Sequence, residues 1–443
     1  MRALVNKIAG TWLEQYKNNI LLKRLTTILG IDILVKASGF ILLPVYLRLM
    51  TQEEYGLYNY LLSIISTFAI VLNFGLYIPL SKLYHDFKNP ERKGTLVFTI
   101  SITLITILVL IILPIYFFKI DYPITNFLFK NAIQYGNYRG IVLLALLMTV
   151  LSFMLTNFFY TSEKIKVVKK YNLSRIILVN LVALWALYLI QGDNVKTRLE
   201  FTYLSELLIF LIFVGFLIKD LSYHFEPKLA SNSLRMGLPI MISAIFGIVI
   251  NFSDKFFLEK YGSLKELSNY YLAFSFASII PTIFASLQNV WVPLFMKEKD
   301  LRKNLQKTNK LIVRLIWIFL VLGAGMWICF RILLLTGIIP QKYSEVTYIL
   351  PLLLVTQIAT SLSHLFSNYL VYFHKTYAVS LTGLLACGIS LGLGILLVPL
   401  WGVYGAASVS LAANLFYLIA FYFLVRYYAN SNLIKIKSEK VQA

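Results

Sequence analysis

Long apolar segments alternate with short polar segments along nearly the whole chain. Each apolar segment is about 18 to 25 residues long, the length at which a helix crosses the hydrocarbon core of a bilayer. Because lipid offers no hydrogen-bonding partner to a backbone, each segment is expected to be helical. The pattern predicts an all-α integral membrane protein with about twelve transmembrane helices, at residues 25–49, 56–80, 94–118, 139–160, 170–190, 199–218, 234–258, 268–293, 309–335, 347–373, 376–399 and 403–426.

The chain repeats its plan halfway. Tyr58 and Tyr270 each stand early in a span that follows a short polar loop, and they are 212 residues apart. The same offset carries Tyr160, at the end of the fourth span, onto Tyr372, at the end of the tenth. An even number of spans in each half predicts a parallel repeat, with two six-helix lobes of the same topology around a central cavity. A substrate path is expected between the lobes.

This repeat divides the chain into five predicted parts. Residues 1–24 place apolar side chains at helical spacing, which predicts an interfacial amphipathic helix. The N-terminal lobe is expected at 25–218, a cytoplasmic linker at 219–233, the C-terminal lobe at 234–426 and a basic cytoplasmic tail at 427–443.

Charged residues are few and collect in alternate loops. Basic side chains outnumber acidic ones at 1–24, 81–93, 161–170 and 296–310, whereas 50–55 is acidic. Because Lys and Arg collect in cytoplasmic loops, both termini are predicted to be cytoplasmic. The net charge of +21 is explained by these loops, without a nucleic-acid partner.

Composition and motifs narrow the functional class. The chain is 59% hydrophobic and 14% charged, and its two cysteines, Cys329 and Cys387, both lie in apolar segments. No disulfide framework, metal-ligand spacing, Walker loop, dinucleotide fingerprint or nucleophile elbow is found. Short outer loops leave no room for a catalytic domain. The sequence favours a carrier without a cofactor over an enzyme.

Polar residues follow one face of several spans. In the eighth span Ser275, Ser278 and Thr282 recur at helical spacing, and in the tenth His364 and Asn368 do so. Shifted by 212 residues, Ser63 and Ser66 match Ser275 and Ser278, and Thr149, Ser152 and Thr156 match Ser361, His364 and Asn368. Such residues either join helices by hydrogen bonds or line a hydrated cavity. Matching stripes in both halves favour a cavity, in which case Phe276 faces lipid.

Two ionisable residues lie deep in the first span. Lys36 is about 16 Å into the predicted helix, and Asp32 lies one turn earlier on the same face. A charge at that depth is costly unless hydrated or paired. Lys36 is therefore a candidate to attract an anionic headgroup from the cavity, and Asp32 is a candidate for ion coupling. A purely structural pair is the alternative.

Other ionisable residues lie inside or near the ends of spans. Glu206 has no oppositely charged neighbour one turn away, so it is a candidate for coupling to protons or sodium ions, as is Asp254. Arg48, Arg175 and Lys255 are basic candidates for substrate contact, while capping and snorkelling are their structural alternatives.

Four motifs resemble Wzx-type polysaccharide flippases, in the superfamily of multidrug, oligosaccharidyl-lipid and polysaccharide exporters. Leu43–Met50 followed by Thr51–Tyr58 is similar to the first hairpin of the family. Met236–Pro239 and Asn251–Lys255 resemble the start of its second lobe, and Val398–Ala407 resembles the turn between its last two helices.

The resemblance implies a V-shaped pair of lobes that moves undecaprenyl-pyrophosphate-linked oligosaccharide across the bacterial inner membrane by alternating access. The product would be O-antigen, capsule or another exopolysaccharide. Membrane lipids, a glycan polymerase and a chain-length regulator are the implied partners. Two alternatives stay open, namely a cation-coupled multidrug exporter of the same fold and a membrane-bound glycan polymerase or ligase.

Overall fold

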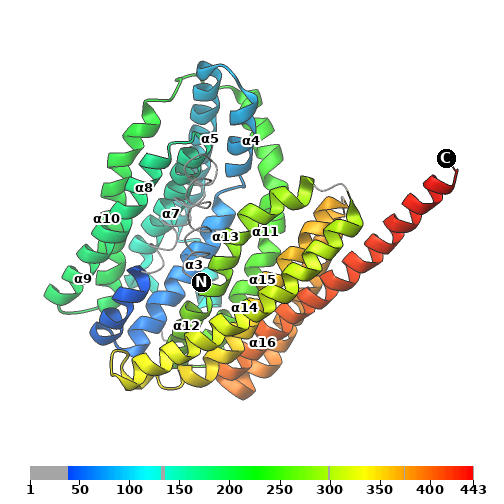
Figure 1. Cartoon of the computed structure of the whole chain (residues 1–443). Coiled ribbons are helices and arrows are strands. Elements are labelled where there is room, and N and C mark those ends of the chain that lie inside the picture. Colours follow the sequence, from blue (N-terminus) through cyan, green and yellow to red (C-terminus); the bar gives the residue numbers. More distant parts are fainter. Residues whose placement is uncertain (1–37, 131–134, 298–299, 374, 443) are drawn as a thin grey trace, which may run out of the picture. The chain divides into compact units, whose positions relative to one another are not determined.

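The computed structural model describes residues 38–130, 135–297, 300–373 and 375–442. Within these ranges the chain is helical and has no strand (Figure 1). The helices are Ser38–Leu49, α3 (Gln52–Leu72), α4 (Tyr77–Asp86), α5 (Pro90–Phe118), α6 (Asp121–Leu128), α7 (Arg139–Thr161), α8 (Ile165–Ser174), a π-helical turn (Arg175–Val179), α9 (Asn180–Leu189), α10 (Asn194–Ile218), α11 (Pro227–Tyr261), α12 (Leu264–Ala277), α13 (Ile279–Lys297), α14 (Leu301–Leu335), α15 (Val346–Tyr372) and α16 (Thr376–Gln442).

Among the described residues, nine helices are long and apolar enough to cross a membrane, or ten if Pro227–Pro239 and Ala244–Tyr261 count as one span. Ser38–Leu49 is a shorter apolar helix that begins where the described residues begin. The all-α membrane architecture predicted from hydropathy is therefore confirmed, whereas the count of twelve and the two-lobe repeat stay predictions. The predicted amphipathic helix at 1–24 lies outside the described residues.

The last two predicted spans form one continuous segment around a glycine. The apolar part of α16 runs over 54 residues, from Tyr377 to Asn430, and about 20 residues suffice for one crossing. Gly402 has φ 51° and ψ −126°, a conformation that residues with a Cβ rarely adopt. This break coincides with the loop predicted at 400–402, so α16 contains two arms.

The second predicted span is not one helix. It ends as α3 at Leu72, and a turn leads to α4. Phe74 (φ 52°) and Gly75 (φ 65°) are both left-handed in this turn. A Cβ at Gly75 would overlap the carbonyl oxygen of Gly237, so the backbones approach too closely there for a side chain. Close packing of two glycines, which a hydropathy pattern does not report, decides where this span stops.

The described residues belong to two compact units that do not follow the order of the chain. One unit comprises Met1–Leu49, Leu72–Leu113 and Asn137–Leu238, and is called unit 1. The other comprises Met50–Val71, Pro114–Gly136 and Pro239–Ala443, and is called unit 2. The α3 helix therefore packs with helices from the second half of the sequence.

Unit 1 is built around α7 and α10, which pack against each other. The α7 helix also contacts α4, and α10 also contacts α9. Fully buried aromatic rings fill the interior, among them Phe158, Phe159 and Tyr171. Tyr171 lies 5.2 Å from the ring of Phe213, edge to face, which joins α8 to α10.

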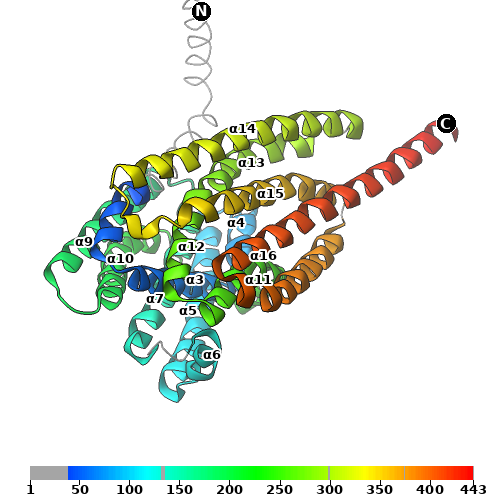
Figure 2. The same ribbon diagram turned by 90° about the horizontal axis from the view of Figure 1, so that it is seen from below.

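Unit 2 is built around α15. This helix packs against α12, α13, α14 and α16, and Figures 1 and 2 show it beside α14 and α16. Its apolar span is 72% buried, far more than any other membrane-length helix of the described residues. A helix surrounded by other helices can carry polar groups, because neighbouring helices rather than lipid satisfy them.

Candidate functional site: a cavity beside Lys255

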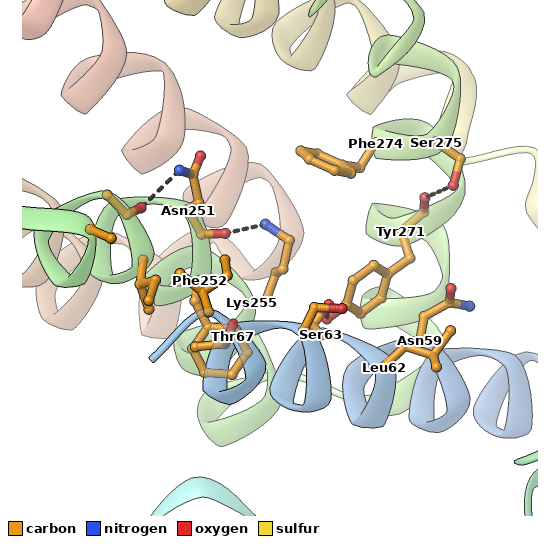
Figure 3. A pocket seen from close by; sticks show the side chains of 15 residues that line it. Asn59, Leu62, Ser63, Thr67, Asn251, Phe252, Lys255, Tyr271, Phe274 and Ser275 are labelled. Atoms are coloured by element: carbon orange, nitrogen blue, oxygen red, sulfur yellow. Dashed lines mark hydrogen bonds between the residues drawn. The ribbon is translucent and has the colours of Figure 1, made fainter. Parts of the chain in front are cut away.

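A cavity of about 520 Å³ lies within unit 2, between α3, α11 and α12. Figure 3 shows side chains from these three helices around it. The α3 helix contributes its face from Asn59 to Ile70, α11 its face from Ala244 to Lys255, and α12 residues Tyr271, Phe274 and Ser275. Segments about 200 residues apart in the sequence thus meet at one site.

The α3 helix presents a polar face because Asn59, Ser63, Ser66 and Thr67 recur every three or four residues. Gly56, one turn earlier, allows α3 to approach α12. A Cβ at Gly56 would overlap the carbonyl oxygen of Leu264 and lie 3.1 Å from the backbone nitrogen of Ser268. This close approach brings the polar face of α3 against the start of α12.

The α12 helix begins with a capping box. The side chain of Ser263 accepts a hydrogen bond from the backbone of Glu266, and Glu266 Oε2 accepts one from the backbone of Ser263 at 2.8 Å. Two turns later the hydroxyl of Tyr271 donates to Ser63 Oγ of α3 at 2.8 Å. The local N-terminal signal therefore sets the position at which α12 faces α3.

Lys255 is the basic residue of the cavity wall. Its side chain is 6% exposed, and its Nζ donates to the backbone oxygen of Asn251 at 2.7 Å. Nζ also lies 3.1 Å from Asp254 Oδ1 and 4.5 Å from the centre of the Phe274 ring. A lysine has three N–H donors, so two are committed and one remains for a ligand.

Asp254 holds Lys255 in place. It is 1% exposed, and its Oδ1 accepts the backbone N–H of Lys255 at 2.8 Å. Its Oδ2 accepts a hydrogen bond from the Tyr270 hydroxyl. Buried charges are tolerated when they are paired and hydrogen-bonded, and this carboxylate is both. Asp254 and Lys255 lie two turns before the end of α11, so they do not cap it.

The cavity wall combines acceptors, hydroxyls and rings with one cation. Asn59 and Asn251 each donate an amide N–H to a backbone oxygen of their own helix, at 2.8 Å, which leaves the amide oxygen as an acceptor. Phe252, Tyr271 and Phe274 provide aromatic surface. Lys255 is the single ionisable lysine, arginine or acid among the lining residues, so the wall suits polyhydroxylated or anionic groups better than a cation.

The predicted polar stripes divide into two groups. Ser63, Ser66 and Ser275 line the cavity together, although they come from α3 and α12. Ser278 and Thr282 do not line it. Ser278 lies at the break between α12 and α13, and its hydroxyl donates to Ser275 O, while Thr282 Oγ1 donates to Ser278 O.

The two predicted residues of α15 contact α13. His364 stacks on Phe284 with ring centres 6.3 Å apart, and Asn368 Nδ2 donates to Gln288 Oε1 at 3.1 Å. These contacts join α15 to α13. They agree with the interpretation that polar residues on this face hold helices together.

Phe276 does not face lipid, contrary to expectation. It is 2% exposed and packs edge to face against Phe330, with ring centres 5.3 Å apart. An apolar side chain is equally compatible with lipid and with a neighbouring helix, so hydropathy does not distinguish the two faces.

Glu206 is paired, which corrects the expectation of an isolated acid. Its Oε1 lies 2.7 Å from a guanidinium nitrogen of Arg175, within unit 1. Glu206 is buried and the Arg175 side chain is 38% exposed. Arg175 opens the π-helical turn, a local irregularity that is frequent at functional sites. The pairing joins residues 31 positions apart, beyond the reach of a helical spacing rule.

The remaining predicted residues are placed elsewhere. Arg48 is exposed near the end of the helix Ser38–Leu49 in unit 1. Asp32 and Lys36 lie outside the described residues. The cavity wall also contains residues that were not predicted as site residues, namely Asn59, Asn251, Phe252, Tyr271 and Phe274. Asn251 and Lys255 are one turn apart, and Asn59 lies one turn before Ser63, so helical spacing from the predicted residues was a usable signal.

The described residues thus form a multi-pass helical membrane protein with a cavity between three helices of unit 2. The model of the family described as polysaccharide biosynthesis protein matches residues 21–299, which is more than half of the chain. The chain belongs to this family, which confirms the resemblance to polysaccharide flippases. No curated protein matches the chain in sequence.

Solved structures share the fold over nearly the whole chain. An inward-facing multidrug resistance MATE family transporter of the MOP superfamily has a TM-score of 0.68 at 14% identity, covering 91% of this chain and 94% of its own. The lipid II flippase MurJ, in an inward closed conformation, has a TM-score of 0.66 at 15% identity, with coverages of 89% and 87%. The Vibrio cholerae MATE transporter VcmN, in its bent form, has a TM-score of 0.56 at 14% identity, with coverages of 93% and 96%. The chain thus shares its fold with these MATE transporters and with the lipid II flippase.

Proposed function

We propose that this protein is a flippase that moves undecaprenyl-pyrophosphate-linked oligosaccharide repeat units across the bacterial inner membrane. The glycan would be used for a surface polysaccharide such as O-antigen, capsule or exopolysaccharide. Transport proceeds by alternating access with both termini in the cytoplasm. The cavity of unit 2, with Lys255 in its wall, is the observation that carries the proposal.

The wall of the cavity suits a sugar. Sugar hydroxyls are donors and acceptors at once, and the amide oxygens of Asn59 and Asn251 accept from them. The hydroxyls of Ser66 and Thr67 can do both, while Phe252 and Phe274 offer apolar surface to the C–H face of a pyranose ring. The remaining N–H of Lys255 favours an anionic group at the edge of the glycan, such as a phosphate oxygen.

The same wall disfavours a cationic drug. A cationic drug is favoured by a free carboxylate, whereas the buried acid beside the cavity, Asp254, is already paired with Lys255 and hydrogen-bonded to Tyr270, and Lys255 itself repels a cation. The MATE likeness therefore supports a shared fold rather than a shared substrate.

Other residues enter the proposal in secondary roles. Lys36, Arg48 and Arg175 are proposed to attract the pyrophosphate, and Asp32, Glu206 and Asp254 to couple transport to an ion gradient. Ser278, Thr282, His364 and Asn368 are retained as candidate cavity residues of another conformation. A glycan polymerase and a chain-length regulator are the proposed partners, and no cofactor is proposed.

The test is the location of lipid-linked glycan in a strain that lacks the gene. Complete repeat units are expected to accumulate on the cytoplasmic face of the inner membrane, and re-expression should release them. Single repeat units that reach the outer face without being polymerised would show that translocation works without this protein, and would favour a polymerase or ligase instead.

A further inference from the structure

Glu259 is a buried carboxyl that the proposed function does not use. It lies in the last turns of α11 and is 4% exposed. Its Oε1 accepts the backbone N–H of Lys130 at 2.8 Å, whereas its Oε2 is buried without a hydrogen-bond partner among the described residues. An ionised carboxylate in such surroundings is costly, and adding one proton at Oε2 removes the charge.

We propose that Glu259 is the proton-binding site through which a proton gradient acts on the cavity of unit 2. In this step a proton from water binds Oε2 and converts the carboxylate into a neutral carboxylic acid. In the return step the same proton leaves for water on the other side of the membrane. The link to transport rests on the proposed function, whereas proton binding itself does not.

The groups that face Glu259 favour a proton over a metal cation. Lys130 and Lys260 are the nearby charges; both stabilise the ionised carboxylate and repel a metal cation, so the burial of Oε2 is what favours a proton there. The Nζ of Lys260 lies over the rings of Phe127 and Phe256. Oε1 is already occupied by an N–H donor, and the described residues contain no group of three His, Cys, Asp or Glu side chains able to hold a metal ion.

A chain of contacts connects Glu259 to the cavity wall. The segment that donates to Glu259 also holds Tyr60, because the Tyr60 hydroxyl donates to Leu128 O at 2.6 Å. The ring of Tyr60 stacks on Phe252, with centres 5.7 Å apart and planes 15° apart, and Phe252 lines the cavity. Glu259 and Phe252 lie two turns apart on one face of α11.

This arrangement explains how one proton affects the cavity. In the structure the segment Leu128–Lys130 packs against Glu259 and leaves its Oε2 without a partner, which a neutral carboxylic acid tolerates. An ionised Oε2 requires water, so it favours movement of that segment away from Glu259. Movement of this segment breaks the hydrogen bond from the Tyr60 hydroxyl to Leu128 O, so the Tyr60 ring is no longer held against Phe252. The charge on Glu259 thereby selects between two arrangements of the cavity wall.

Infrared difference spectroscopy of the full-length protein in lipid nanodiscs tests proton binding without any substrate. The unsubstituted protein is expected to show a protonated-carboxyl C=O band near neutral pH, which disappears on alkalinisation. Glu259→Gln, which imitates the protonated side chain, should remove the band. Glu200→Gln should retain it, because Glu200 is 39% exposed and beside Lys196. An unchanged band in Glu259→Gln would overturn the proposal.

Selective ¹³C labelling of glutamate assigns the band to a glutamate without a substitution, since the band must then shift. A band that does not shift belongs to another residue type and overturns the assignment.

In proteoliposomes with lipid-linked oligosaccharide, Glu259→Gln should lose stimulation by a pH gradient while retaining gradient-independent exchange. Unaltered stimulation by the pH gradient, or stimulation by sodium alone, would overturn the link to transport. If the unsubstituted protein moves no glycan lipid, the proposed function fails and the spectroscopic result still stands.

Discussion

Arg175 and Glu206 are joined by an ion pair of 2.7 Å that connects the π-helical turn to α10 within unit 1. The acid is 6% exposed and the base 38% exposed, so the pair is shielded on one side. Removing one partner leaves the other charge without compensation, which is the costly way to break a buried pair. Loss of Arg175 would therefore leave a buried charge at Glu206, whereas loss of Glu206 would leave a partly solvated charge at Arg175.

We expect Arg175→Ala to lower the free energy of unfolding by about 1–3 kcal/mol, less than for a fully buried pair because Arg175 is partly solvated. Thermal unfolding of the purified protein in detergent measures the change. The double variant Arg175→Met/Glu206→Leu removes both charges and should recover most of the loss. A double variant less stable than Arg175→Ala would show that the pair is not the source of the effect.

We expect Lys255→Met combined with Asp254→Asn to abolish glycan translocation in cells while leaving the protein inserted. Both charges are removed together, so no unpaired charge is buried, while the N–H donor of the cavity and the proposed coupling carboxylate are lost. Lys265→Ala is the matched control, because Lys265 is 62% exposed and its pair with Glu53 is worth about 0–1 kcal/mol. Normal surface glycan in the double variant, at matched expression, would remove Lys255 from the mechanism.

Cysteine accessibility tests the cavity directly. In a background with Cys329→Ser and Cys387→Ser, Thr67→Cys is expected to react with a hydrophilic thiol reagent, because Thr67 lines the cavity. Phe276→Cys should stay unmodified, since that position is 2% exposed inside unit 2. Equal labelling at both positions would contradict the assignment of the cavity.

Gly402→Ala should destabilise the protein by about 1–3 kcal/mol, because φ 51° with ψ −126° is strained for any residue with a Cβ. A Cβ there would also overlap the carboxylate of Glu266, which caps α12. Gly392→Ala is the control. It stands in the same helix with nothing within 4 Å of a built Cβ, and should change stability by less than about 1 kcal/mol. Equal melting temperatures for the two variants would show that the break tolerates a side chain.

The helices of this protein were largely predictable from local pattern. Spans 139–160 and 347–373 agree closely with α7 and α15, and the break at Gly402 falls in the predicted loop. Span 309–335 ends with α14 at Leu335, although α14 begins earlier, at Leu301. The predicted spans 56–80 and 268–293 are each divided into two helices in the structure, for the same reason. Both the turn at Gly75 and the break at Ser278 interrupt apolar helices, and hydropathy is unchanged across such an interruption.

The candidate site was only partly predictable. Helical spacing indicated Ser63, Ser66 and Ser275, and charge indicated Lys255. Glu259 was not identified, because its position near the end of a span resembles that of an ordinary loop acid until its burial and its unpartnered oxygen are seen.

The sequence alone determined that this is a polytopic helical membrane protein, because the length and hydropathy of each span are local properties and the bilayer acts on each span separately. The tertiary structure alone decided which faces meet. Lipid and protein are equally apolar surroundings, so the burial of Phe276, the pairing of Arg175 with Glu206 and the meeting of α3 with α11 and α12 depend on close approach of helices far apart in the chain.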